Sequence, residues 1–487
     1  MGGCRRQVEK RVMMIDKSKI NRPFAISDWE GRNGVVYFIG IGGIGMSALA
    51  RFFLAHGNRV SGYDRTPTTL TKELEAEGIS VHYEENTGMI PKDAGLVVYT
   101  PAIPAGHKEL QYYRENGYRV VKRSEVLEII TKSSFNICIA GTHGKTTITT
   151  MVAHLLRDSG FGCNAFLGGI AVNYGTNFWS SEKNICVVEA DEYDRSFLKL
   201  HPDIAVITAM DADHLDIYGT PEAMEQAFIG FSRQVQPGGL LIRQFGLKRG
   251  KELKAGNQLT YSLQNEHADI YASDIRMTGG SYVFNLQVKG DQIPDIRLDM
   301  GGMHNVENAI AAIGIASSLD IDHDRIRSAV QSFRGVKRRF EYIIKNNRLV
   351  FIDDYAHHPE ELRSLISGAK SLFRQKKCTV IFQPHLYSRT RDLADGFAEA
   401  LDMADEVILL PVYPARELPL EGVNSHMILD RMKNENKKLV TKEDVLNWTE
   451  QVYIPGLNRE FGAVLVTAGA GDIDMLTEPL KNILKEV

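Results

Sequence analysis

The chain has 487 residues, of which 24% are charged and 43% hydrophobic, and its formal net charge is −4. This length predicts two to four domains, and the composition is typical of a soluble globular protein. A slightly acidic chain without a long basic tract is not expected to have nucleic acid as a main partner.

Residues 1–33 are polar and mixed in charge, and we expect them to form a poorly ordered extension. They lack the apolar core of a signal peptide. The apolar run over residues 34–50 contains five glycines and ends at Arg51, so it is too short to span a bilayer and predicts no membrane partner. The five cysteines show no paired spacing, which favours a reducing, cytoplasmic compartment.

Strand-like apolar runs alternate with helical patterns along the rest of the chain, which predicts three α/β domains. Residues 34–131 form the first, a Rossmann-like domain. Residues 132–343 form a central P-loop ATPase-type domain with a mostly parallel sheet and an antiparallel stretch near residues 259–298. Residues 344–487 form a C-terminal Rossmann-like domain.

The sequence "GIGGIG" over residues 40–45 follows an apolar strand and opens a helix. A glycine turn at a helix N-terminus holds a diphosphate, and this spacing is the dinucleotide-binding pattern. Asp64 follows the next strand, where such proteins carry an acid that contacts the nucleotide. Taken alone, these residues predict an NAD-dependent oxidoreductase. The binding residues would be Gly40, Ile41, Gly42, Gly43, Ile44, Gly45 and Asp64.

A second phosphate loop, "GTHGKTT" over residues 141–147, also lies between a strand and a helix. Its lysine and first threonine are placed as in a P-loop, where they reach the β- and γ-phosphates and Mg²⁺, although Ile139 stands where the standard pattern has Gly. The ATP-binding residues would be Gly141, Thr142, His143, Gly144, Lys145, Thr146 and Thr147. A nucleotide-switched binding module would carry such a loop too, but it would not need a separate third domain.

Acidic residues follow two further strands and could complete a metal site. Glu189 ends the strand "CVVE", and Asp211, Asp213, His214 and Asp216 follow the strand "VITAM". The carboxyl ends of parallel strands are where α/β proteins bind ligands, and Mg²⁺ prefers oxygen ligands. Most of these acids are expected to be solvated turn residues, whereas Glu189 is expected to point out of the sheet edge.

Seven motifs occur in the order found in the Mur ligases, and residues 34–475 resemble that family. They are "GTHGKTT", "EADE", "DHLD", "GMHNVENAIAA", "RRFEY", "DDYAHHPEE" and "FQPHLYSRTRDL". The resemblance is to the branch that joins L-alanine to UDP-N-acetylmuramate through an acyl phosphate formed with ATP. Within the family, addition of a recycled peptide, or glycine or serine as acceptor, remains an alternative.

The resemblance implies a role for individual residues. The catalytic residues would be Lys145, Glu189, His214, Arg338 and His358. Two Mg²⁺ ions, or Mn²⁺, would be held by Thr146, Glu189 and His214. ATP would also contact His304, Asn305, Arg338, Arg339 and Asp354. The amino-acid and acyl site would include Tyr355, His385 and Arg389.

Two positions depart from the family pattern. Leu386 stands where many relatives have Arg after "QPH", and Ala209 stands where relatives often have Asn, so polar contacts at both positions are in doubt. The resemblance also changes the meaning of "GIGGIG". Because a UDP-sugar carries a diphosphate as NAD does, the first loop is expected to bind the UDP end of the substrate.

Overall fold

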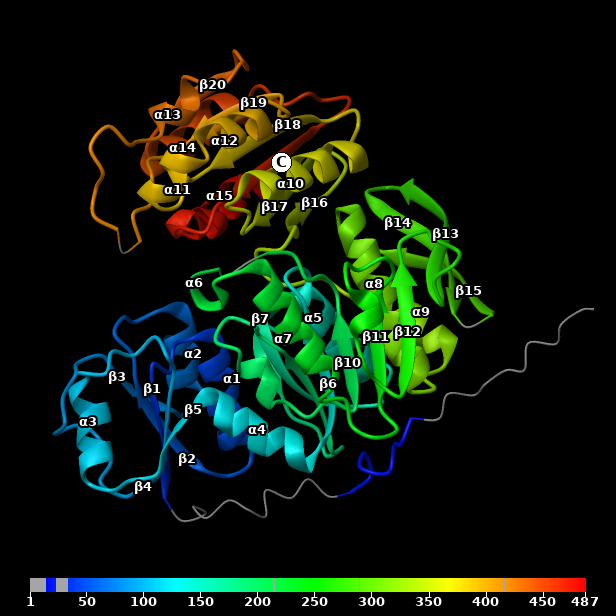
Figure 1. Cartoon of the computed structure of the whole chain (residues 1–487). Helices are drawn as coiled ribbons and strands as arrows, with labels where there is room; N and C mark the ends of the chain where they lie inside the picture. The colour runs from blue at the N-terminus through cyan, green and yellow to red at the C-terminus, as the bar shows by residue number, and fades with distance from the viewer. Residues whose placement is uncertain (1–14, 23–33, 213–214, 289, 416) are drawn as a thin grey trace, which may run out of the picture.

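The computed structural model describes residues 15–22, 34–212, 215–288, 290–415 and 417–487. Three α/β domains follow one another along the chain, and the third lies above the other two in the view of Figure 1. The predicted fold class is confirmed. No helix in the described part of the chain is long and apolar enough to cross a bilayer.

The N-terminal domain is a parallel sheet in the order β3-β2-β1-β4-β5. Its central strands are buried apolar runs, as expected of a parallel sheet covered on both faces. The strands are β1 (Val35–Ile39), β2 (Arg59–Tyr63), β3 (Ser80–His82), β4 (Ala94–Tyr99) and β5 (Val120–Lys122). The helices are α1 (Ile44–Ala55), α2 (Thr69–Ala76), α3 (Lys108–Glu115) and α4 (Arg123–Ser133).

The central domain is a mixed sheet in the order β15-β14-β13-β12-β11-β10-β6-β9-β7-β8. The strands from β13 to β7 in this order run parallel, whereas β14 pairs antiparallel with both β13 and β15, and β7 pairs antiparallel with β8. The predicted antiparallel stretch is therefore present.

The strands of this sheet are β6 (Phe135–Ala140), β7 (Asn164–Ala171), β8 (Thr176–Trp179), β9 (Ile185–Glu189), β10 (Ile204–Ile207), β11 (Leu240–Gln244), β12 (Asn257–Ser262), β13 (Ile270–Thr278), β14 (Ser281–Val288) and β15 (Asp291–Leu298). The helices are α5 (Lys145–Asp158), α6 (Leu215–Tyr218), α7 (Pro221–Ser232), α8 (Met303–Ser318) and α9 (His323–Ser332), with 3₁₀ turns η1 (Ser196–Lys199) and η2 (Gly250–Glu252).

The C-terminal domain is a sheet in the order β16-β17-β21-β18-β19-β20, parallel except for the edge strand β16. Its strands are β16 (Glu341–Lys345), β17 (Leu349–Asp354), β18 (Lys377–Phe382), β19 (Glu406–Leu409), β20 (Lys437–Leu439) and β21 (Ala463–Ala468). Its helices are α10 (Pro359–Leu372), α11 (Tyr387–Asp392), α12 (Ala394–Leu401), α13 (His426–Leu429), α14 (Lys442–Trp448) and α15 (Thr477–Leu484), with short turns η3 (Thr449–Tyr453) and η4 (Asp472–Leu476). Because β16 pairs with β17, the C-terminal domain begins before the expected residue 344.

Residues 15–22 differ from the expected extension. Ile15 and Ile20 are buried in the core of the central domain, and Lys19 pairs with Asp203 at 3.0 Å. The backbone N–H of Asn184 also donates to the carbonyl of Ile20. Two isoleucines spaced within a polar stretch therefore anchor this segment, while the rest of residues 1–33 lies outside the described part of the chain.

Candidate active site between the central and C-terminal domains

The P-loop lies between β6 and α5, at the carboxyl edge of the central sheet. Gly144 has φ 78°, a left-handed conformation that glycine adopts without strain, and α5 begins at the next residue. The loop is bonded to the segment that follows β10. The N–H of Thr142 donates to the carbonyl of Ala209, and the Thr208 hydroxyl donates to the carbonyl of His143. The backbone thus presents a helix N-terminus, with its favourable dipole, to an anion.

Lys145 lies at the start of α5 beside two buried carboxyl groups. Its ammonium donates to Glu192 at 2.6 Å and to the carbonyl of Gly141 at 2.8 Å. Burial raises the pKa of the Glu192 carboxyl, and the charge of Lys145 opposes that rise. Lys145 therefore compensates the charge of a buried acid and bonds the backbone of the phosphate loop.

Glu189 and Thr146 meet where β9 and α5 lie side by side. The Thr146 hydroxyl donates to Glu189 Oε1 at 3.0 Å, and burial raises the pKa of the Glu189 carboxyl. The other carboxylate oxygen, Oε2, is buried and has no hydrogen-bond partner among the described residues. A buried carboxylate oxygen without a donor is an uncompensated group, and a divalent cation beside the Thr146 hydroxyl would satisfy it.

The strand connection after β10 is described only in part. Asp211 lies 3.5 Å from the His143 imidazole, and both side chains are mostly exposed. Asp213 and His214 lie outside the described residues, so the predicted second metal ligand has no description here.

The two residues predicted to contact adenine differ in their surroundings. His304 lies in the first turn of α8, and burial together with the charge of Arg339 lowers the pKa of its imidazole. Asn305 is buried, donates to the carbonyl of Gly301 and accepts from Asn308. Its carboxamide is thus engaged inside the protein. The Asn308 carboxamide lies against Gly144 of the P-loop, so Asn308 packs on the loop.

The linker between the domains carries Arg338 and Arg339. Arg338 is directed into the C-terminal domain, where it bonds the carbonyl of Gly469 and lies 3.3 Å from Asp353. Burial raises the pKa of the Glu189 and Asp354 carboxyl groups, and the charge of Arg339 opposes that rise at both. In this conformation the Arg338 guanidinium is engaged within the C-terminal domain.

Asp354 and Tyr355 follow β17 and fix the linker to the C-terminal domain. The Asp354 carboxylate accepts from the N–H of Phe340 at 2.6 Å and of Ala356 at 2.7 Å, and burial raises its pKa to about 6. The Tyr355 N–H donates to the carbonyl of Arg338. The Asp354 carboxylate therefore bonds backbone groups of the protein, whereas the Tyr355 side chain is exposed.

The histidine pair of "DDYAHHPEE" divides into two roles. His358 is the N-cap of α10, and its ring accepts from the Glu360 N–H at 3.5 Å. His357 lies in ring contact with Tyr355 and with His385. Burial lowers the pKa of His357, which favours a neutral ring.

His385 and Arg389 stand beside this pair, at the start of α11. His385 Nδ1 and Arg389 Nη1 are both buried without a hydrogen-bond partner among the described residues. Burial lowers the pKa of His385, and the neighbouring Arg389 lowers it further. Leu386 between them has φ 70°, a strained conformation of the kind found at functional sites. A small carboxylate would satisfy both orphan groups.

The first glycine loop is held by Asp64. Its carboxylate accepts from the N–H of Gly42 at 2.7 Å, so it shapes the loop. Ile41 is buried in the core, whereas Gly43 and Ile44 are exposed at the start of α1. Backbone N–H groups at the exposed end of a helix are suited to a diphosphate.

Arg123 is a site residue that the sequence analysis missed. A methyl group added at Gly45 would overlap its guanidinium, which places the charge against the first glycine loop. It also lies 3.9 Å from Asp191 of the central domain. Arg123 opens α4, about 80 residues after the loop, so no local motif marks it.

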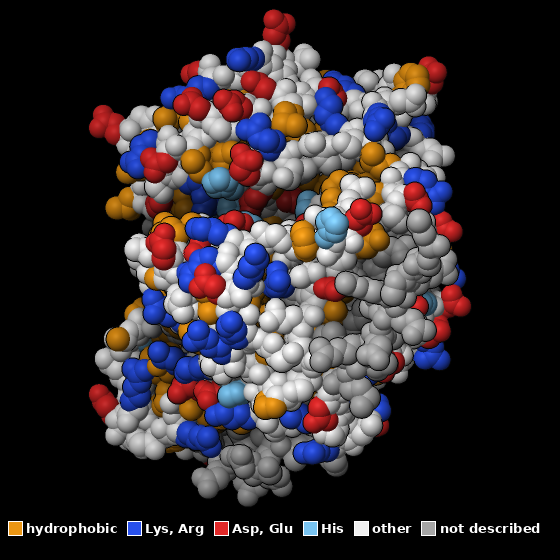
Figure 2. Space-filling view, turned by 45° about the vertical axis from the view of Figure 1, so that its right-hand side comes forward, with side chains coloured by type: hydrophobic (Ala, Val, Ile, Leu, Met, Phe, Trp, Pro, Cys, Tyr) orange, Lys and Arg blue, Asp and Glu red, His pale blue; other side chains and the backbone are white. Residues whose placement is uncertain are grey.

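Figure 2 shows a hollow below the upper domain, with histidine and carboxylate side chains at its walls. Two glycine loops on neighbouring domains, a buried carboxylate beside the second, and unpartnered buried nitrogens of His385 and Arg389 on a third domain fit one class of protein: a ligase that activates an acid with ATP. Three matches fix the family. Residues 35–134 match "Mur ligase family, catalytic domain", residues 139–316 match "Mur ligase middle domain", and residues 338–471 match "Mur ligase, glutamate ligase domain". The chain belongs to the Mur ligase family.

Its relatives match over nearly their full length. The UDP-N-acetylmuramate–L-alanine ligase of Flavobacterium johnsoniae is 47% identical over 93% of this chain and 98% of its own. That of Porphyromonas gingivalis is 49% identical over 92% of this chain and 99% of its own. The crystal structure of the UDP-N-acetylmuramate-alanine ligase from Thermotoga maritima is 29% identical, with a TM-score of 0.79, and covers 93% of this chain and 100% of its own.

Proposed function

We propose that this chain joins L-alanine to the lactyl carboxylate of UDP-N-acetylmuramate, with ATP converted to ADP and phosphate, in peptidoglycan precursor synthesis. One observation carries the proposal: relatives named for this activity are 47–49% identical over more than nine tenths of both chains. An NAD-dependent oxidoreductase would leave the second phosphate loop and its carboxylates without a use.

The reaction proceeds in two stages. The γ-phosphoryl group of ATP passes to the lactyl carboxylate, and the amine of L-alanine then attacks the acyl phosphate to give an amide and phosphate. Phosphoryl transfer depends on positioning and charge neutralisation. The first glycine loop, with Arg123, would hold the UDP diphosphate, and Lys145 would neutralise the transferring phosphoryl group with Arg339 beside it.

Mg²⁺, or Mn²⁺ in its place, would be held by Thr146 and Glu189, whose unpartnered Oε2 fits a cation. His214 is proposed for a second ion. The described residues contain no cluster of three His, Cys, Asp or Glu side chains, so phosphate oxygens and water would complete the coordination, as Mg²⁺ prefers. The ion supplies charge neutralisation at the β- and γ-phosphates.

The amino-acid site is proposed at His385 and Arg389, with Tyr355 and His357 beside them. The Arg389 guanidinium would bind the alanine carboxylate. A neutral imidazole, favoured because burial lowers the pKa of His357 and of His385, would accept a proton from the alanine ammonium group, and the free amine would then attack the acyl phosphate. We place the reaction in the cytoplasm, since the four described cysteines are free buried thiols.

Phosphate release tests the proposal. The purified chain is assayed with ATP and Mg²⁺, with or without UDP-N-acetylmuramate, and with L-alanine, glycine, L-serine or a muramyl-type tripeptide. We expect release only when both the muramate nucleotide and an amino donor are present, with the largest kcat/KM for L-alanine. Release that does not require the muramate nucleotide would refute the function, and preference for the tripeptide would move the chain to the peptide-adding branch.

A further inference from the structure

The β7–β8 hairpin of the central domain holds a buried asparagine against the N-terminal domain. Asn177 on β8 is fully buried, and its side-chain amide donates to the carbonyl of Ile44 at 2.6 Å and to the Ser47 hydroxyl at 2.9 Å. Its carbonyl oxygen accepts from Arg51 at 2.5 Å. All of its hydrogen-bonding groups are therefore directed at one helix, α1, of the other domain.

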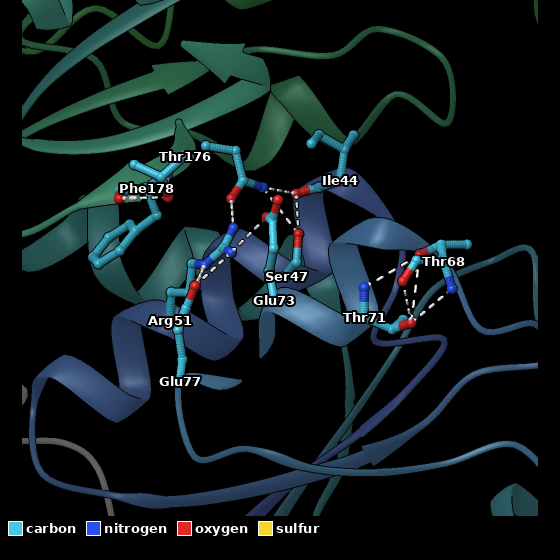
Figure 3. Close-up of polar contacts among 10 residues, drawn as sticks. Ile44, Ser47, Arg51, Thr68, Thr71, Glu73, Glu77, Thr176 and Phe178 are labelled. Atoms are coloured by element: carbon cyan, nitrogen blue, oxygen red, sulfur yellow. Dashed lines mark hydrogen bonds and ion pairs between the residues drawn. The ribbon is translucent and has the colours of Figure 1, made fainter. Parts of the chain in front are cut away.

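The charge of Arg51 is neutralised on its own side of this interface. Its guanidinium is 5% exposed and bonds Glu77 at 2.6 to 3.0 Å and Glu73 at 3.3 Å, both of the N-terminal domain. Figure 3 shows the Arg51 side chain joined to Glu73 and Glu77. The position of the Arg51 guanidinium is thus set by bonds within the N-terminal domain, and Asn177 bonds it from the other domain.

Asn177 contacts the N-terminal end of α1, which is the end proposed to bind the diphosphate. Ile44 is the first residue of the helix and directly follows Gly43 of the glycine loop. A hydrogen bond to the Ile44 carbonyl therefore sets the position of the N–H groups that face the UDP diphosphate. Phe52 of α1 packs on Phe166 and Phe178 of the hairpin, with ring centroids 5.3 and 6.0 Å apart, and this contact supports the grip.

The same hairpin lies against the second phosphate site. A methyl group added at Gly168 of β7 would overlap the Glu189 carboxylate, and one at Gly169 would lie 3.1 Å from the Thr146 methyl. The backbone of β7 therefore packs directly on the carboxylate and the hydroxyl proposed to hold the metal.

The hairpin is bonded to the linker as well. The Lys337 N–H donates to the carbonyl of Ile170, and the Val172 N–H donates to the carbonyl of Gly335. The β7–β8 hairpin thus contacts both phosphate loops and the linker to the C-terminal domain.

From this geometry we propose that the β7–β8 hairpin is a spacer between the two phosphate loops, and that Asn177 is the positioning residue through which it acts. This inference rests on the proposed function. The lactyl carboxylate, held by its UDP end, must meet the γ-phosphoryl group in line, and a displacement of about 1 Å costs about a hundredfold in rate. Asn177 touches neither substrate, and its effect is on the distance between them.

The test compares two asparagines of one hairpin. Asn164 starts β7, is equally buried, and donates to the carbonyls of Lys183 and Ile185 inside the central domain, far along the strand from Gly168. Asn177→Ala and Asn164→Ala each remove buried hydrogen bonds, so both are expected to lower the melting temperature. In a rapid-quench single turnover that follows ADP formation, Asn177→Ala should slow phosphoryl transfer about 10- to 100-fold, whereas Asn164→Ala keeps the wild-type rate.

The steady-state constants supply a second readout. Because both loops keep their own contacts, Asn177→Ala should lower kcat while KM for ATP and for UDP-N-acetylmuramate changes little. Ser47→Ala, which removes only one of the hydrogen bonds to Asn177, should lower kcat less. This variant replaces Asn177→Ala in the test if Asn177→Ala does not fold. Equal transfer rates for the two asparagine variants would overturn the positioning role. A wild-type chain inactive with every amino donor would instead refute the proposed function.

Discussion

The ammonium group of Lys145 lies 2.6 Å from the Glu192 carboxylate, in a pair with little exposure to water. A buried pair that loses one partner leaves an uncompensated charge, which costs about 3–5 kcal/mol. Two effects of replacing Lys145 are therefore separable: loss of a phosphate-binding charge, and loss of a structural partner.

Lys145→Ala is expected to lose turnover by about 10³-fold or more, the scale of a cation that stabilises a transferring phosphoryl group. The variant is also expected to unfold at a lower urea concentration than the wild type. Adding Glu192→Gln to the variant removes the buried charge, so the double variant should regain stability and remain inactive. Urea unfolding and phosphate release measure the two properties. Recovery of turnover in the double variant would contradict the phosphate role.

Asp354 makes stability depend on pH. Burial raises its pKa to about 6 from an ordinary value near 3.8, so between these values the folded chain binds a proton that the unfolded chain releases. The contribution of Asp354 is therefore present at low pH and is lost as pH rises through about 6, by up to about 3 kcal/mol.

Asp354→Asn provides the reference, because asparagine does not titrate. The stability of the wild type relative to Asp354→Asn should fall as pH rises from 4 to 7 in urea unfolding experiments. A difference that stays flat across this range, or grows with pH, would show that the Asp354 pKa is not raised.

At the scale of elements, residues 15–22 form a strap on the central domain. Ile20 is buried in the central core, whereas the partner of Lys17 is Asp320, whose side chain is 84% exposed. Ile20→Ala is expected to lower the free energy of unfolding by about 2–4 kcal/mol, and Lys17→Ala by less than about 1 kcal/mol. Equal effects in urea unfolding would show that the strap is not anchored by its apolar residues.

The position of His358 at the N-terminus of α10 allows a structural role to be tested against a catalytic one. As an N-cap, its side chain accepts a backbone N–H, and asparagine can do the same. His358→Asn should keep the stability of the wild type, and His358→Ala should lose about 1 kcal/mol. Both should keep turnover within about tenfold, since a general acid or base is worth about 10²–10⁴-fold. A loss of that size in both variants would restore the catalytic role implied by the family resemblance.

At the scale of the whole molecule, patterns that are local in sequence predicted most of the arrangement. The phosphate loops, Glu189 and the three sheets follow from strand ends and glycine spacing, which act over a few residues. Arg123 and Asn177 could not be predicted, because their partners, Gly45 and Ile44, lie on another element or domain. The isoleucines of residues 15–22 gave too sparse a pattern to indicate burial.

The linker shows where the molecule can bend. Lys337 is bonded to β7 of the central domain, while Phe340 is bonded to Asp354 of the C-terminal domain. Arg338 stands between them with φ 60°, a conformation that non-glycine residues rarely adopt. The hinge is therefore expected at Arg338.

Spin labels on exposed residues of the three domains test this motion. Met89, Met277 and Val452 are 53%, 43% and 56% exposed, and pairs of cysteines placed there in a Cys4→Ser background can be labelled while the four described native thiols stay buried. On addition of Mg²⁺, UDP-N-acetylmuramate and a non-hydrolysable ATP analogue, the distance between positions 277 and 452 should change, because the hinge lies between them. The distance between positions 89 and 277 should stay constant, because Asn177 and the Phe52 contacts hold those domains together. A comparable change in both distances by double electron–electron resonance would show that the N-terminal domain moves as well, and the hairpin would then not be a rigid spacer.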